Sequence, residues 1–198
     1  MCIRDSGISP GSSRDFLSVG THYLVLTDLP LAGRGSGVDN VRMIESRTLL
    51  IVAHAPSDNT QRLRDAVEAG AVSAQAEYVK LVVRTPFEAN ADDVRAAKAL
   101  VLGTTENLGY MSGALKDFFD RVYYPCLDDT RGLPYALYIR AKLDGTGTRR
   151  AVESIASGLG WRAVQEPMIC HGEWREDFAR DCHELGMAMA AGLDGGIF

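Results

Sequence analysis

Short apolar runs alternate with helical patterns along the chain from Arg47 onward, and this alternation is the strongest constraint on the fold. None of the runs is followed by a two-residue turn of the kind that makes a β-hairpin. Strands that are separated by helices favour a parallel sheet covered on both faces. We therefore expect an α/β fold with a doubly wound, five-stranded sheet. The expected strands are residues 48–53, 78–83, 97–102, 134–139 and 162–170.

Helical periodicity is predicted for the segments between these strands. The first expected helix, residues 60–76, has an apolar face made of Leu63, Val67 and Ala71. Asp92 and Asp93 are expected to cap a short helix before the third strand. The next helix, residues 112–123, carries apolar side chains at helical spacing: Leu115, Phe118, Phe119 and Val122. Two further helices are expected at about 148–159 and 174–191.

Length and charge limit the class of protein. The 198 residues, of which 46% are hydrophobic, are enough for a single core with some excess. The net charge of -5 and the lack of a basic stripe argue against a nucleic-acid partner. No apolar run approaches the roughly 20 residues of a membrane helix, and no secretory signal pattern opens the chain. We expect a soluble, cytoplasmic protein without membrane insertion.

The cysteines fit the same compartment. Cys2, Cys126, Cys170 and Cys182 are scattered and form no Cys-x-x-Cys pair. This pattern favours free thiols in a reducing compartment over a disulfide framework or a zinc site.

Residues 1–46 differ in character from the rest of the chain. Glycines and serines are frequent there, and only the stretch from Tyr23 to Leu26 resembles a strand. Such a composition favours a poorly ordered extension, or upstream sequence that is not part of the native domain. A lid or an oligomerisation arm is the alternative. The domain itself is expected to span residues 47–198.

The first candidate loop runs from His54 to Thr60, between the first strand and its helix. The start of a helix offers unpaired backbone N–H groups and a partial positive charge, both of which favour a phosphate. Ser57, Asn59 and Thr60 add short polar side chains. The same residues are also favoured in an ordinary turn with a helix cap, so both interpretations stay open. The Gly-x4-Gly-Lys-Ser/Thr pattern of ATP and GTP sites is absent.

The second candidate loop follows the third strand, from Gly103 to Met111. Its backbone from Thr104 onward offers donors and acceptors for the rim of a flat ring, and Gly109 allows a close approach. Tyr110 is available for stacking on such a ring. A plain surface loop with Tyr110 packed on a neighbour is the alternative.

These two motifs resemble those of the flavodoxin-like family, in particular the NAD(P)H-dependent FMN reductases and related flavodoxin-fold oxidoreductases. Ser57-Asp-Asn-Thr60 resembles the family's Ser-Gly-Asn-Thr phosphate loop. The stretch from Gly109 to Arg121 is close to the family's second-loop signature and is the more specific match. The resemblance covers residues 48–193 and implies the strand order 2-1-3-4-5. It also implies FMN at the switch point between the first and third strands.

The resemblance implies a third flavin-contacting loop after the fourth strand, where Lys142, Asp144 and Gly145 could border the ring. A plain connection is the alternative there. His54 lies at the end of the first strand, where it could contact phosphate or merely turn the chain. The expected cofactor-binding residues are His54, Ser57, Asp58, Asn59, Thr60, Thr104, Thr105, Glu106, Asn107, Leu108, Gly109, Tyr110, Lys142, Asp144 and Gly145.

Two positions depart from the family pattern. Asp58 stands where the family usually has glycine, and a carboxylate that pointed at a phosphate would repel it. Asp58 must therefore turn outward, or the pocket is altered. Thr105 stands where most related sequences carry proline, which predicts a less rigid loop.

Other chemistries are poorly supported. His171 and Glu173, or Cys182 and His183, are ligand-type residues without metal-site spacing, so no metal is expected. Cys126 has no phosphatase loop around it, and the Gly-x-Ser-x-Gly motif of serine hydrolases is absent. No dedicated catalytic acid or base is expected, because a flavin carries the chemistry itself.

The resemblance implies an FMN-dependent oxidoreductase that takes hydride from NAD(P)H and passes electrons to a quinone or another small acceptor. Relatives of this kind are often oligomers. An electron carrier that docks with protein partners is the first alternative, although a charge of -5 is mild for one. A scaffold of the same fold that has lost flavin is the second.

Overall fold

The computed structural model describes residues 46–198. The predicted N-terminal extension, residues 1–46, lies outside this range except for its last residue. The main sheet runs in the order β2-β1-β3-β5-β6, with every neighbouring pair on this path parallel. Its strands are β1 (Arg47–Ala53), β2 (Val79–Arg84), β3 (Ala97–Asn107), β5 (Pro134–Ala141), β6 (Arg162–Ala163) and β7 (Met168–His171). A short strand, β4 (Tyr110–Met111), pairs antiparallel with the end of β3.

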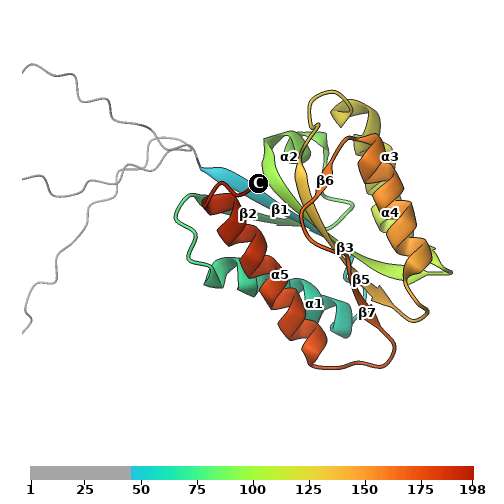
Figure 1. Cartoon of the computed structure of the whole chain (residues 1–198). Helices are drawn as coiled ribbons and strands as arrows, with labels where there is room; N and C mark the ends of the chain where they lie inside the picture. Colours follow the sequence, from blue (N-terminus) through green and yellow to red (C-terminus); the bar gives the residue numbers. More distant parts are fainter. Residues whose placement is uncertain (1–45) are drawn as a thin grey trace, which may run out of the picture. The chain divides into compact units, whose positions relative to one another are not determined.

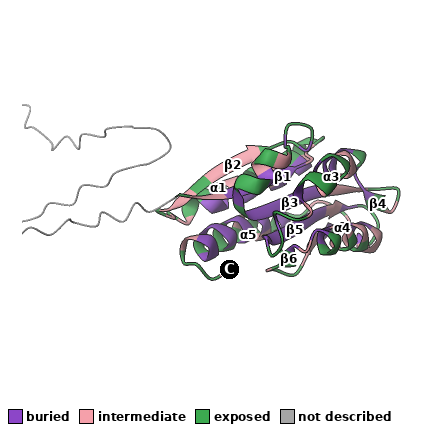
Figure 2. Cartoon of the chain, turned by 90° about the horizontal axis from the view of Figure 1, so that it is seen from above, coloured by how far each residue is buried: buried purple, intermediate pink, exposed green. Residues whose placement is uncertain are grey.

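Helices cover both faces of this sheet (Figures 1 and 2). One face carries α1 (Asp58–Ser73) and α5 (Asp177–Asp194), and the other carries α2 (Ala91–Ala96), α3 (Gly113–Cys126) and α4 (Thr146–Gly158). This is the doubly wound arrangement that the sequence predicts. No helix in the described part of the chain is long and apolar enough to cross a membrane.

The central strands are buried on both sides, as Figure 2 shows. Leu49 to Val52 in β1 are fully buried. Leu50 and Val52 pack with the α3 side, whereas Leu49 and Ile51 pack with the α1 side, as the two-residue period of a strand requires. A run of four apolar residues is therefore needed at this position rather than an alternating pattern.

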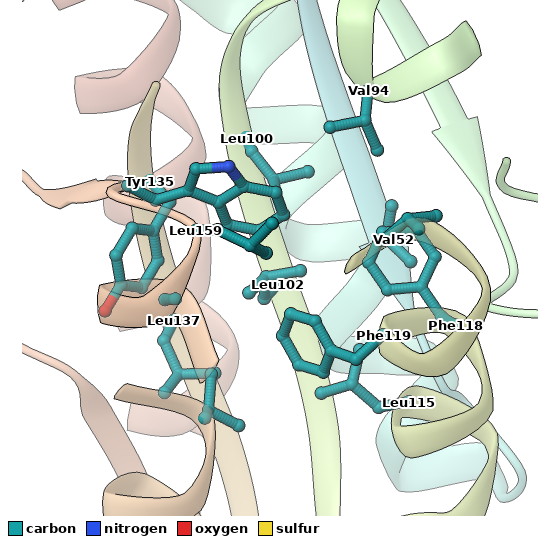
Figure 3. Packing of buried hydrophobic residues seen from close by; sticks show 14 of the residues in the cluster. Val52, Val94, Leu100, Leu102, Leu115, Phe118, Phe119, Tyr135, Leu137 and Leu159 are labelled. Carbon is teal, nitrogen blue, oxygen red and sulfur yellow. The ribbon is translucent and has the colours of Figure 1, made fainter. Parts of the chain in front are cut away.

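The core under α3 and α4 is rich in aromatic side chains (Figure 3). The rings of Phe118 and Phe119 lie 5.5 Å apart, and Phe119 also contacts Trp161 at 6.2 Å between ring centroids. Trp161 donates its indole N–H to Thr130 Oγ1 at 2.9 Å, so its polar atom is satisfied inside the core.

The structure adds a hairpin that the sequence did not predict, although the five expected strands are joined by helices. β3 continues to Asn107 and turns directly into β4 through Leu108 and Gly109. Both turn residues have positive φ, 54° for Leu108 and 75° for Gly109, which is the geometry of a tight two-residue hairpin. The first turn position is usually Asn, Asp or Gly, so the leucine there concealed the hairpin.

Three smaller boundaries also differ. Asn90 is the N-cap of α2, because its side chain accepts the N–H groups of Asp92 and Asp93. Asp93 takes part in the cap as predicted, since its carboxylate accepts the Asn90 N–H at 3.0 Å. The expected fifth strand is split into β6 and β7, which pair with the two ends of β5. The last helix begins at Asp177 instead of 174, after a loop that contains Trp174.

Glycines allow α1 and α5 to approach each other closely. A Cβ on Gly70 would collide with the backbone carbonyl of His183, and a Cβ on Gly186 would collide with that of Val67. The backbones of the two helices are therefore in direct contact at two places, with no room for a side chain.

We predict that Gly186→Ala destabilises the protein. In an open helix this change stabilises by about 1 kcal/mol, but overpacking against Val67 costs about 1 to 3 kcal/mol and a shift of the helix. The free energy of unfolding in urea measures the result. Gly113→Ala, at a helix start with open space around it, is the control. A stability gain for Gly186→Ala would show that the helices separate without cost.

Candidate functional site

Three loops leave the sheet at the carboxyl ends of adjacent strands, β1, β3 and β5. The pairing of β1 with β3 ends where Ala53 faces Gly103, and His54 N–H donates to Gly103 O at 2.9 Å. β3 and β5 stay paired two residues further, to Thr105 and Arg140. Ligands of open α/β sheets bind at such an edge, where neighbouring connections diverge to opposite faces.

The first loop closes on itself through a helix cap. Ser57 N–H donates to Thr60 Oγ1 at 2.9 Å, and the Thr60 hydroxyl donates to Ser57 O at 2.7 Å. Thr60 is buried, and its hydroxyl is used in these hydrogen bonds within the turn. The backbone hydrogen bonds of α1 begin at Gln61, whose N–H donates to Ser57 O. Ser57 N–H is engaged by Thr60, so the N–H groups of Asp58 and Asn59 are the ones that remain available to an anion.

His54 stands beside this turn with an unused polar atom. Its Nδ1 is buried and has no hydrogen-bond partner among the described residues. Burial lowers the pKa of His54 below the ordinary value, because the charged imidazolium loses solvation. A neutral ring is therefore favoured when nothing negative lies nearby.

The other predicted residues of this loop differ in exposure. Ser57 and Asp58 are exposed, and Asn59 is half-buried. Since Asp58 is the first residue of α1 and is exposed, its carboxylate can stay in water, away from the amide groups of the turn.

The second loop begins with a buried pair of hydroxyls. Thr104 Oγ1 lies 3.1 Å from Ser112 Oγ, and Ser112 Oγ accepts the N–H of Leu115 as the cap of α3. Thr104 is almost fully buried. Its side chain therefore fixes the start of α3, and only its backbone is left for a ligand.

The tip of the second loop is open. Leu108 is fully exposed, and Tyr110 is 43% exposed. Thr105 donates its hydroxyl to Asn107 Oδ1 at 2.9 Å, which ties the strand end to the turn without the proline of the family pattern. Tyr110 packs on no aromatic neighbour in the described region, which leaves its ring free to stack on a ligand.

The third loop is held by carboxylates. Asp144 Oδ1 accepts the N–H of Thr146 at 2.9 Å, and this hydrogen bond lowers the pKa of Asp144. Gly145 has φ of 72° and caps α4, a conformation that favours glycine. Glu106 reaches across from β3 and accepts N–H groups of this loop. Lys142 is exposed and makes no hydrogen bond to the rest of the described chain.

The structure also brings in residues that the sequence did not single out. Arg62 of α1 lies 4.5 Å from the ring centroid of Trp174 and pairs with Glu176, so the loop before α5 flanks the first turns of α1. Gly147, in the first turn of α4, touches the carbonyl of Gly109. These contacts join elements that are far apart in sequence, and no local pattern marks them.

No cluster of His, Cys, Asp and Glu that could hold a metal ion occurs among residues 46–198. The three cysteines in that range, Cys126, Cys170 and Cys182, are buried and free.

No protein-family model and no curated protein matches the chain. Solved structures, in contrast, do match the chain in fold. A WrbA-like flavodoxin from Agrobacterium tumefaciens gives a TM-score of 0.60 at 18% identity, covering 77% of this chain and 99% of that one. The two-electron reduced flavodoxin of Megasphaera elsdenii gives 0.60 at 19% identity, covering 72% and 98%. An oxidoreductase from Corynebacterium diphtheriae gives 0.55 at 17% identity, covering 76% and 96%.

The fold is therefore flavodoxin-like, as the sequence predicts. The parallel order of the five main strand positions and the helices on both faces agree with this class. At these identities the comparisons define the fold, and the ligand has to be argued from the loops.

We predict that His54 makes unfolding depend on pH. Its folded-state pKa lies below its unfolded value, so the unfolded state binds more protons and stability is lost as pH falls below about 6.5. His54→Gln should reduce the loss of stability between pH 7.5 and 5.5, measured by urea unfolding. His171→Gln, at an exposed position, is the control. An NMR titration of His54 at or above the ordinary pKa would contradict the prediction.

Proposed function

We propose that this edge of the sheet binds FMN, with the phosphate at the start of α1 and the ring between the second and third loops. The observation that carries the proposal is the buried, unpartnered Nδ1 of His54 beside a helix start with free N–H groups. A phosphate oxygen would give both kinds of group a partner. The Thr60 hydroxyl is engaged in the cap, and Ser57 Oγ hydrogen-bonds it at 3.1 Å, so Ser57 can only add a further contact to a phosphate. Asn59 is the half-buried polar side chain that we propose as the freer of the two.

The backbone after Gly103 supports the ring position. β1 stops pairing with β3 at Gly103, so the β3 residues beyond it have no β1 partner on that side. Their peptide groups can bond the polar rim of an isoalloxazine, because unpaired backbone groups require partners. Tyr110 and Leu108 supply exposed apolar surface at the same place.

Bound FMN would supply the redox chemistry, accepting hydride from a nicotinamide and delivering electrons to an acceptor. The chain's own residues would bind, orient and shield it. We propose NAD(P)H as the donor and a quinone or another small molecule as the acceptor. Arg149 is already paired with Glu153 and Glu166, so it is a poor candidate for the dinucleotide phosphate.

An electron carrier is the second candidate function. The exposure of Leu108 and Leu143 near the same edge favours it, because apolar surface beside a redox site suits a transient protein partner. Retained flavin without NAD(P)H oxidation would favour the carrier. Absence of flavin binding would favour a scaffold that has lost its cofactor.

We predict that Asp58→Asn tightens FMN binding by about fivefold at low salt. Removing an exposed carboxylate from the first turn of α1 takes away repulsion of about 1 kcal/mol toward a phosphate there. Titration calorimetry with FMN measures the change, and 0.5 M salt should reduce it.

Two comparisons separate this effect from net charge and from ring binding. Glu68→Gln makes the same charge change three turns further along α1 and should have little effect. Riboflavin lacks the phosphate, so its affinity should not respond to Asp58→Asn. An equal gain for riboflavin and FMN would contradict a phosphate at this helix start.

A further inference from the structure

The carboxylate of Glu106 joins the second loop to the third. Its Oε2 accepts the N–H of Leu143 at 2.7 Å, and its Oε1 accepts the N–H of Gly145 at 3.1 Å. Glu106 belongs to β3, whereas both donors belong to the turn that follows β5. One side chain therefore occupies two backbone donors of a loop that lies 37 residues away in sequence.

A close backbone approach gives the same two segments a second contact. The carbonyl of Gly109 lies so close to Gly147 that a Cβ on Gly147 would collide with it. The β3–β4 turn therefore rests directly on the first turn of α4. Glu106 thus holds the third loop at Leu143 and Gly145, and the helix turn that follows the loop rests on Gly109.

We propose that Glu106 is a positioning residue that holds the two ring-binding loops at a fixed separation, and does not itself contact the ring. Both of its oxygens are directed at the third loop, which leaves its backbone as the part available to a ligand. This inference rests on the proposed FMN site.

The geometry explains why a carboxylate is suited to this position. An ionised carboxylate presents two acceptor oxygens in a plane, so it can take two N–H groups that are separated by one residue. An amide side chain offers only one oxygen, and alanine offers none. The strength of the connection should therefore fall in the order Glu, Gln, Ala.

The first experiment measures the hydrogen bonds between Glu106 and the third loop without flavin, by residue-resolved amide hydrogen exchange in the whole chain. In Glu106→Ala the amides of Leu143 and Gly145 should exchange at least about tenfold faster, with Glu106→Gln between this variant and the original. Amides in the middle of α1 should not change. Glu173→Ala, which removes an exposed carboxylate at the same end of the sheet, is the control.

FMN titration then measures how the loss of these hydrogen bonds affects flavin binding. Glu106→Ala should weaken FMN binding by about tenfold and shift the visible absorption maximum of the bound flavin, because the ring is held less firmly. Gly147→Ala should weaken binding similarly without any change of charge, since it displaces the turn at Gly109. Gly113→Ala, with open space around it, should do neither.

Unchanged exchange of Leu143 and Gly145 in Glu106→Ala would overturn the connection itself, whatever the flavin result. Faster exchange with unchanged FMN affinity and spectrum would overturn the positioning role. If the unaltered chain failed to bind FMN, the proposed function would fall and the positioning role with it. The exchange data on the flavin-free chain separate that failure from failure of the connection.

Discussion

Burial of β1, β3 and β5 on both faces is the constraint on which the rest of the structure depends. Their side chains alternate between two helical layers, and residues such as Leu50 and Ile51 have no exposed surface. A polar group without a partner is costly on these faces, and the buried Tyr138 hydroxyl of β5 is one such group among the described residues. The loops at the strand ends offer polar groups that a ligand can reach, and parallel pairing brings the loops after β1, β3 and β5 to one edge.

At that edge, many polar side chains are already hydrogen-bonded within helix caps and loops. Thr60 closes the turn before α1, and Thr104 with Ser112 fixes the start of α3. Glu106 and Asp144 hold the loop before α4. What is left for a ligand is mainly backbone, together with His54 and a few short side chains. This division favours a cofactor that brings its own reactivity.

The sequence predicts the fold well because its strongest signals are local. Apolar runs and helical spacing depend on burial, which β1 and the α3 residues Phe118 and Phe119 experience as expected. The β3–β4 hairpin was missed because leucine at a positive φ is uncommon. Asn90 was overlooked as the N-cap of α2 because Asp92 and Asp93 lie close to it, and Asn and Asp are both good caps.

The site was only partly predictable, for a related reason. Loop positions followed from the strand pattern, but the direction of each side chain depends on partners distant in sequence. Glu106 contacts Leu143, and Arg62 contacts Trp174, although each pair is far apart in sequence. The spacing of apolar residues along the chain carries no information about such contacts. The residues expected to touch a ligand therefore divide into those that hold the loops and those that remain free.

The FMN site at this edge is tested most directly by the visible absorption spectrum of the purified chain during anaerobic titration with FMN, followed by NADH or NADPH. An FMN-dependent oxidoreductase should give a bound-flavin spectrum that bleaches when one of the two nicotinamides is added. A spectrum of free FMN at all ratios, with no sign of binding in excess, would contradict the proposed site.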